Sequence, residues 1–210
     1  EDGIRDCLLS RGLGDVYKRQ AAVSEANGKP LSIHIEQINM RVTINGESRI
    51  TRGNIMASNG IIHVINKVIP LPSLVTFVKA DQNLGGLFQA LTRSDLTTDF
   101  VSILSTTPSK SPAPFTVFAP TSQAFTDLLA ELGVQRLTSI DEPTLSSTLT
   151  YHVIAGKIAA TDVVSALEKG NGTVELKALN GQVLTVVQKD GKIWLKDLNG
   201  NYSEIVATDV

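Results

Sequence analysis

The adjacent residues Tyr151 and His152 are the side chains of this sequence best suited to acid–base chemistry, because an imidazole and a phenol can both transfer protons. Catalysis would also need a nucleophile or a metal ion within hydrogen-bond reach, and the sequence supplies neither at a recognisable spacing. Buried polar groups are usually satisfied by hydrogen bonds to neighbouring groups. We therefore expect His152 to bond a backbone group beneath the tyrosine ring, with ligand binding as the alternative, and we predict no catalytic residue.

The two other histidines do not extend this pair into a metal site. His63 lies in an apolar run and is expected to be structural, whereas His34 is expected on the solvent-facing side of a strand. Three histidines scattered along a chain do not make a zinc site. Cys7 is the only cysteine, which excludes internal disulfides and cysteine metal sites. We expect neither a metal nor another cofactor.

The charge balance argues against two classes of partner. The net charge is −2, so nothing indicates an electrostatic grip on nucleic acid or on an anionic membrane. No apolar run approaches the roughly 20 residues that a membrane-spanning helix needs. Gly85-Gly86 follows no predicted strand and lacks the third glycine of a dinucleotide-binding loop. The composition is otherwise that of an ordinary globular protein.

The elements that position these residues are clearest just before the Tyr-His pair. Residues 115–118 form an uncharged, β-favouring run that predicts a buried strand with Phe118 in the core. Pro120 ends this strand, and Thr121 can cap the helix that follows by accepting a backbone N–H. Apolar residues at helical spacing then continue from Phe125 to Gly133, where a glycine favours the end of the helix.

This strand–helix segment resembles the first signature of the fasciclin domain family. The run Tyr151-His152-Val153-Ile154 is similar to the Tyr-His element of that family, and residues 60–70, which include His63, resemble the second signature, which closes a domain. The matching regions span most of residues 31–210. The resemblance implies an α+β fold, a fasciclin-like wedge of two packed sheets flanked by short helices.

The order of these signatures indicates more than one domain. In a fasciclin domain the closing signature follows the Tyr-His element, whereas here residues 60–70 precede it. Residues 44–55 also align with residues 198–210, and both segments are a hairpin turn followed by a strand. We therefore expect the C-terminal portion of a first domain over residues 21–72 and a second domain over residues 73–210 that lacks its closing strand.

The ends of these parts have their own patterns. Residues 1–20 have no sustained hydrophobic period and do not resemble the family, so we expect a non-native, adapter-like segment there. Pro70-Leu71-Pro72 forms a stiff junction between the two domains. Apolar spacing and capping residues then predict short helices as far as Gly170. After it come four strands separated by Asn-Gly and Asp-Gly turns, over residues 174–178, 182–188, 192–196 and 204–210.

What the resemblance implies for function is an extracellular adhesion or matrix-interaction module that is not an enzyme. Such a module is secreted or at the cell surface and binds an extracellular protein or a polysaccharide through its surface. The alternative is a small-ligand-binding domain or a polysaccharide-associated accessory domain of an enzyme. Trp194 is expected to pack on a sheet, but on an exposed face it can stack on a sugar.

Two further expectations concern partners. Asp162 and Val163 follow the Tyr-His element, whose neighbourhood in some fasciclin proteins is thought to engage integrins; the simpler interpretation of Asp162 is an acidic residue in the first turn of a helix. A second domain that lacks its closing strand would leave an unpaired edge. Residues 60–69 are a spare copy of that strand, so a strand-swapped homodimer is one expected arrangement.

Overall fold

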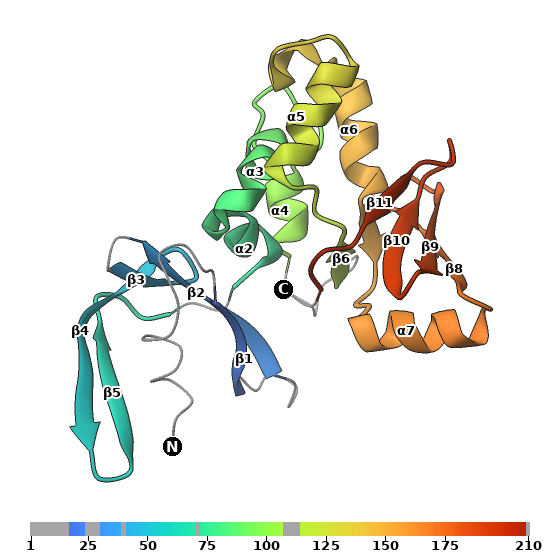
Figure 1. The fold of residues 1–210 in the computed structure, drawn as a ribbon. Helices are drawn as coiled ribbons and strands as arrows, with labels where there is room; N and C mark the ends of the chain where they lie inside the picture. The colour runs from blue at the N-terminus through green and yellow to red at the C-terminus, as the bar shows by residue number, and fades with distance from the viewer. Residues whose placement is uncertain (1–16, 24–29, 39–40, 70–71, 107–113, 209–210) are drawn as a thin grey trace. The chain divides into compact units, whose positions relative to one another are not determined.

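The computed structural model describes residues 17–23, 30–38, 41–69, 72–106 and 114–208. Residues 1–16 of the segment predicted to be non-native and the first two residues of the proline junction lie outside this description. The chain divides into two compact units, residues 1–82 and residues 83–210. These units run from blue to green and from green to red in Figure 1, and each is described by itself.

Unit 1 contains a five-stranded antiparallel sheet whose strands lie side by side in chain order. Asn45 and Gly46 form the turn between the third and fourth strands with positive φ angles of 52° and 67°, as the primed hairpin turns require. The Asn-Gly turn predicted from the sequence is therefore present. The strands are β1 (Tyr17–Val23), β2 (Pro30–Ile38), β3 (Arg41–Ile44), β4 (Ser48–Ala57) and β5 (Gly60–Ile65).

A short helix, α2 (Leu74–Ala80), completes unit 1. Ser73 begins it with a capping box, in which its hydroxyl accepts the Thr76 N–H. The helix lies so close to the β3–β4 turn that a Cβ atom on Gly46 would be 2.8 Å from the Cβ of Ala80. The compact units consequently divide after α2, whereas the sequence places the boundary before it, at residues 72 and 73.

The same helix explains why the expectation for His34 is wrong. His34 is 1% exposed rather than solvent-facing. The ring of Phe77 on α2 meets the His34 ring edge-on, with 6.5 Å between the centroids. The backbone N–H of His34 donates to Asn45 Oδ1 at 2.9 Å. Strand alternation separates the face of β2 that holds Ile33 and Ile35 from the face that holds His34. Only the position of α2 determines which of these two faces is covered.

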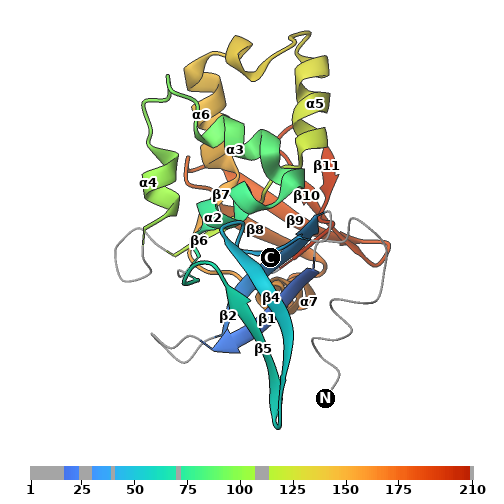
Figure 2. The same ribbon diagram turned by 90° about the vertical axis from the view of Figure 1, so that its left-hand side faces the viewer.

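Unit 2 begins with the short helices that the sequence predicts. Thr121, Asp99 and Asp141 cap three of them by accepting backbone N–H groups. Figures 1 and 2 show α3, α5 and α6 toward one end of the unit and α7 toward the other. The helices are α3 (Gly85–Leu91), α4 (Phe100–Leu104), α5 (Ser122–Glu131), α6 (Glu142–Tyr151) and α7 (Ala160–Lys169), with 3-10 turns η1 (Gln82–Leu84) and η2 (Leu137–Ser139).

The signature strand of the sequence is shorter than predicted. Strand β6 (Phe115–Val117) pairs antiparallel with β7 (Val153–Ala155), and Phe115 is buried. Phe118 follows the strand and is half-buried, so its predicted place in the core is wrong. Its N–H donates to the carbonyl of His152 at 2.9 Å, but the His152 N–H donates to Leu149 at the end of α6, so the return bond that would extend the strand to Phe118 is missing.

The C-terminal part is the predicted antiparallel meander, a four-stranded sheet with the order β11-β10-β9-β8. Its strands are β8 (Thr173–Lys177), β9 (Val183–Lys189), β10 (Lys192–Lys196) and β11 (Tyr202–Glu204). The strand predicted over residues 204–210 overlaps β11 only at Glu204, because residues 205–208 form no strand, and residues 209 and 210 lie outside the described residues. Leu184 and Val186 of β9 are buried on its inner face. Helices followed by a meander confirm the α+β class.

Candidate functional site

The Tyr-His pair lies at the end of α6, where His152 is the C-cap residue. Its Nδ1 atom donates to the carbonyl of Thr148 at 2.8 Å, since a carbonyl can only accept. The hydroxyl of Tyr151 donates to the carbonyl of Val183, at the start of β9, at 3.1 Å. The two rings meet edge to face, with centroids 6.2 Å apart. Tyr151 therefore ties α6 to β9, and His152 bonds back onto the last turn of α6 itself.

The electrostatics of the pair do not favour proton transfer near neutral pH. Burial lowers the pKa of His152, and the hydrogen bond to the Thr148 carbonyl opposes this only in part. Burial also raises the pKa of Tyr151, with a further contribution from the negative charge of Asp197. Burial thus favours the neutral imidazole and the neutral phenol, and both neutral forms still carry the proton that each backbone hydrogen bond needs.

A shallow hollow lies beside Tyr151. Thr148 Oγ1 in its lining already donates to the carbonyl of Thr144 at 2.8 Å. Tyrosine is the only titratable residue in the lining, so the hollow offers neutral polar contacts and no acid–base pair. It is lined by Pro143, Thr144, Ser147, Thr148, Tyr151 and Gln182.

The remaining candidates in unit 2 serve the ends of helices. Thr121 caps α5 by accepting the Ala124 N–H at 3.2 Å. Asp162 lies in the first turn of α7 and accepts the Ala159 N–H at 3.0 Å, and its neighbour Val163 is half-buried. Each residue has a local hydrogen-bonding or packing role on its own helix, and those roles do not bring them into one site.

His63, in unit 1, supports an irregularity of the β4–β5 ribbon. The register of this ribbon shifts between Arg52 and Ile55. Within the shift, the Asn54 N–H donates to His63 Nδ1 at 3.3 Å, and a Cβ atom on Gly53 would lie 3.3 Å from the same nitrogen. The imidazole thus accepts a hydrogen bond from a backbone N–H that has no partner in the strand pairing.

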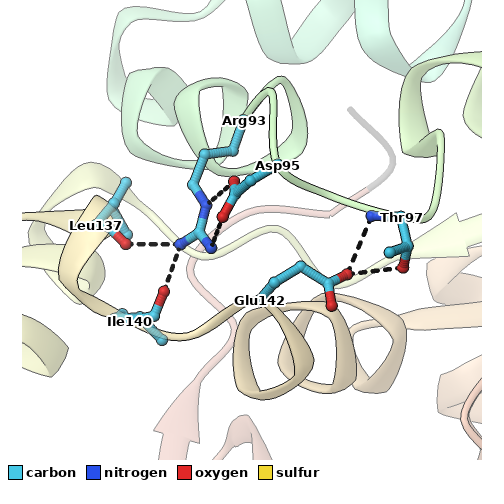
Figure 3. Close-up of polar contacts among 6 residues, drawn as sticks. All are labelled: Arg93, Asp95, Thr97, Leu137, Ile140 and Glu142. Carbon is cyan, nitrogen blue, oxygen red and sulfur yellow. Dashed lines mark hydrogen bonds and ion pairs between the residues drawn. The ribbon is translucent and has the colours of Figure 1, made fainter.

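Sequence reasoning missed a junction around Arg93, which Figure 3 shows. The Nη1 atom of Arg93 donates to the carbonyls of Leu137 and Ile140, both at 2.7 Å. Its Nε and Nη2 atoms donate to Asp95 at 2.6 and 2.7 Å. The fork joins the end of α3 to the η2 turn. Its carbonyl partners are more than 40 residues further along the chain, so no local pattern could identify them.

A second contact joins the same two segments. The carboxylate of Glu142, at the start of α6, accepts both the N–H and the hydroxyl of Thr97, at 3.1 and 2.8 Å (Figure 3). The Arg93 and Glu142 contacts hold the polypeptide around α6 in place and leave no free charge aimed at a substrate. We assign this junction a structural role.

Metal binding and membrane insertion find no support in the part of the chain that the structure describes. It brings no three His, Cys, Asp or Glu side chains together in a group that could hold a metal ion. Of the helices described, none has both the length and the apolar composition needed to cross a bilayer.

Comparison with known families gives a match over most of the chain. The model of the fasciclin domain matches residues 8–72 and 82–210. Among solved structures, a domain pair of fasciclin I, described as an insect cell adhesion molecule, aligns with a TM-score of 0.54. That alignment covers 92% of this chain and 61% of the other, and the 14% identity means that it shows the fold alone.

Curated relatives span a wide range of lengths. Protein sll1483 of Synechocystis is 35% identical over 123 residues, which are 59% of this chain and 58% of that protein. Rat stabilin-2 is 31% identical over 160 residues, 71% of this chain and 11% of the relative. Human periostin is 32% identical over 115 residues, 54% of this chain and 12% of the relative. The chain thus spans little more than half of the first relative and about a tenth of the others.

Proposed function

The chain belongs to the fasciclin domain family, and on that premise we propose that it is an extracellular adhesion or matrix-interaction module, secreted or displayed at a cell surface. It binds an extracellular protein or a polysaccharide through its surface and catalyses no reaction. Supporting this proposal, the fold neighbour is part of a cell adhesion molecule. The observation on which the proposal depends most is the Tyr-His pair, because both of its side chains are engaged by backbone groups.

A small-ligand site is the second candidate function, and the hollow beside Tyr151 is the observation that favours it. Its neutral hydroxyl and amide groups suit a small uncharged polar molecule. Ligand pockets usually enclose most of their ligand between apolar walls. This hollow is shallow and lined mainly by polar residues, so surface recognition is the better-supported proposal.

The two units belong, in this proposal, to successive fasciclin domains. The internal repeat supports the assignment, because Asn45-Gly46 precedes β4 in unit 1 and Asn199-Gly200 precedes β11 in unit 2. Strand β5 pairs with the outer edge of β4, whereas β11 pairs, among the described residues, only with β10. The β5 strand of a second copy would suit the open edge of β11, which gives a strand-swapped homodimer.

Retention of the full chain on immobilised ligands tests the proposed function. One set of surfaces is coated with extracellular-matrix proteins and another with matrix polysaccharides, and the heat-unfolded chain is the control. We expect saturable retention of the folded chain on at least one surface. We expect no chemical change in the immobilised ligand. If the chain binds no ligand of either set, the adhesion proposal is contradicted. Hydrolysis of a polysaccharide would favour an enzymatic function over adhesion.

A further inference from the structure

The outer face of the β8–β11 sheet is a feature of unit 2 that the fold itself does not use. Side chains alternate between the two faces of a strand, so the register places twelve residues on this face. The buried Leu184 and Val186 mark the opposite, inner face. The outer face consists of Thr173, Glu175, Lys177, Val183, Thr185, Val187, Lys189, Lys192, Trp194, Lys196, Tyr202 and Glu204.

None of these twelve side chains is buried in the described structure. Tyr202 is 50% exposed and Val183 is 39% exposed, whereas Leu184 and Val186 are 4% and 0% exposed. An aromatic or branched side chain that remains uncovered on a sheet face contributes little to the core. The outer face is therefore available to a partner.

Two aromatic rings occupy the centre and one edge of this face. Trp194 lies opposite Val187 of β9 and Glu204 of β11, and its Nε1–H donates to the carbonyl of Lys189 at 3.4 Å. Tyr202 lies opposite Lys196, whose ammonium is 5.9 Å from the centre of the tyrosine ring. Both rings stand on paired strands, which gives the face a rigid aromatic surface.

Lysines lie on three of the four strands of this face. The face holds Lys177, Lys189, Lys192 and Lys196 against Glu175 and Glu204, and Lys192 is already paired with Glu204 at 2.8 Å. Three lysines and one glutamate remain, with Asp190 in the turn at the end of the face. The face is positive in a chain whose net charge is −2.

We propose that this face binds an acidic polysaccharide, an inference that rests on the proposed function and names its ligand class. Sugar rings stack on Trp194 and Tyr202, and carboxylate or sulfate groups bind the lysines on either side. Lys189 lies opposite Lys192 at one end of β10, and Lys196 lies at the other end, four residues or about 13 Å away at 3.3 Å per residue, with Trp194 between these two levels. That arrangement suits a chain of sugars whose charges recur along its length.

The composition of the face favours a polysaccharide over the other partners. Cores of protein interfaces are depleted in lysine, whereas here lysines lie directly beside the aromatic rings. Single-stranded nucleic acids also stack on aromatic rings, but they depend on a strongly basic groove. A small positive excess on a chain of net charge −2 does not form such a groove, whereas separate lysines beside aromatic rings suit sugar rings that carry acidic groups.

Trp194 itself provides the measurement, because it is the only tryptophan of the chain. The full chain is titrated with heparin oligosaccharides, which carry sulfates, and with oligogalacturonates, which carry only carboxylates, while tryptophan emission is followed. Neutral dextran and a single-stranded oligonucleotide are the comparison ligands. We expect a saturable change in emission with at least one acidic sugar and weaker binding as salt rises.

Matched triple variants assign the binding to the face. Lys177, Lys189 and Lys196 are all changed to glutamine in one, and Lys67, Lys79 and Lys157, exposed lysines elsewhere, in the other. We expect the first to raise the Kd at least about tenfold, as the loss of a single charge-assisted contact does, and the second to leave it within about twofold. Tyr202→Ala should also weaken binding at unchanged melting temperature.

Three results would overturn this inference. They are the absence of an emission change with either acidic sugar, equal losses in the two triple variants, and equally tight binding of the oligonucleotide. Each can occur while the chain still adheres to matrix proteins. In that case the adhesion proposal stands and only its polysaccharide face is wrong.

Discussion

His152 ends α6 with its ring bonded back to Thr148, one turn earlier in the same helix. Its carbonyl accepts the Phe118 N–H, so a single residue joins α6, β6 and β7. Burial favours the neutral imidazole, and the bond to Thr148 places its proton on Nδ1. The protonation of this ring and the hydrogen bonds of the Arg93 guanidinium group both affect the stability of the fold.

The first prediction concerns the pH dependence of stability. The pKa of His152 is lower in the folded protein than the ordinary value of 6.5, so the unfolded chain binds this proton more readily. The free energy of unfolding should fall as the pH decreases below 6.5, until the pH passes below the folded pKa. His152→Asn keeps an N–H donor without a titrating group, so its stability should depend less on pH over that window.

Urea unfolding of both proteins at pH values on either side of 6.5 measures this difference. The two other histidines are unchanged in the variant and cancel in the comparison. Parallel loss of stability in the two proteins would show that the imidazole is not held neutral by the fold.

The second prediction concerns Arg93, whose side chain is 8% exposed. Lysine cannot reproduce a fork that bonds two carbonyls and a carboxylate together. We expect Arg93→Lys to lower the free energy of unfolding by about 2 kcal/mol, within the range for hydrogen bonds of charged groups. Asp95→Asn is the control and should cost less, because the Asp95 side chain is 57% exposed. If urea unfolding shows equal losses for Arg93→Lys and Asp95→Asn, the stabilisation comes from the Arg93–Asp95 ion pair rather than from the hydrogen bonds to the Leu137 and Ile140 carbonyls.

At the scale of elements, α3 and α5 pack with almost no space between them. Ser122 at the start of α5 accepts the Gly86 N–H at 3.1 Å and donates to the carbonyl of Asn83 at 2.9 Å. Above this contact, Phe125 lies against the backbone of Gly86. The first turn of α3 thus depends on a glycine at one of two adjacent positions.

The third prediction uses these two glycines as a matched pair. A Cβ atom at position 86 would lie 2.9 Å from the ring of Phe125, so Gly86→Ala should destabilise the protein by about 1–3 kcal/mol through overpacking. At position 85 the nearest atom is Ser122 Oγ at 3.7 Å, an ordinary contact. Gly85→Ala should therefore be neutral or stabilise by up to about 1 kcal/mol, as alanine favours a helix. Thermal unfolding that ranks the two variants in the opposite order would contradict the close packing of α3 and α5.

The fourth prediction concerns the end of β6. Phe115 is 8% exposed and paired in the strand, so Phe115→Ala should cost about 3–5 kcal/mol, as aromatic truncations in cores do. Phe118→Ala should cost clearly less, because that ring is half-buried beyond the end of the strand. Urea unfolding compares the two variants directly. A larger loss of unfolding free energy for Phe118→Ala than for Phe115→Ala would support the longer strand with Phe118 in the core, as predicted from the sequence.

At the scale of the whole molecule, the β4–β5 ribbon and the open edge of β11 are two surfaces that strand addition requires. Ile62 and Val64 lie on one face of β5 and are 54% and 43% exposed, and Met56 of β4 is 69% exposed. Apolar side chains on an open ribbon favour pairing with another chain.

The fifth prediction is that the chain forms a concentration-dependent dimer that Ile62→Asp disrupts. A carboxylate in the middle of β5 disfavours its burial against a second copy. Ser58→Asp, in the turn at the tip of the ribbon, adds the same charge without entering the strand and should leave the dimer intact. Sedimentation velocity over a range of concentrations measures both variants. A wild-type chain that stays monomeric throughout would contradict the strand-swapped arrangement.

Much of the local structure of the site can be predicted because its causes lie within a few residues. Thr121 caps α5 and Asp162 lies in the first turn of α7, as their positions before apolar helical runs indicate. The hairpin turns at Asn45-Gly46 and Asn199-Gly200 follow from residues that adopt positive φ, both residues in the first turn and Gly200 in the second. The resemblance to the fasciclin family, which rests on such local runs, is confirmed by the family match.

The sequence by itself determined the α+β class, the family, the capped helices and the hairpin turns. The tertiary structure decided that His34 is covered by α2, that Phe118 lies outside the core, and that Arg93 bonds carbonyls far along the chain. It also decided that Trp194 and four lysines share an uncovered face. The physical reason is that caps and turns depend on neighbours in the chain. Burial and long-range hydrogen bonds depend instead on which element packs against which face, and strand alternation leaves that choice open.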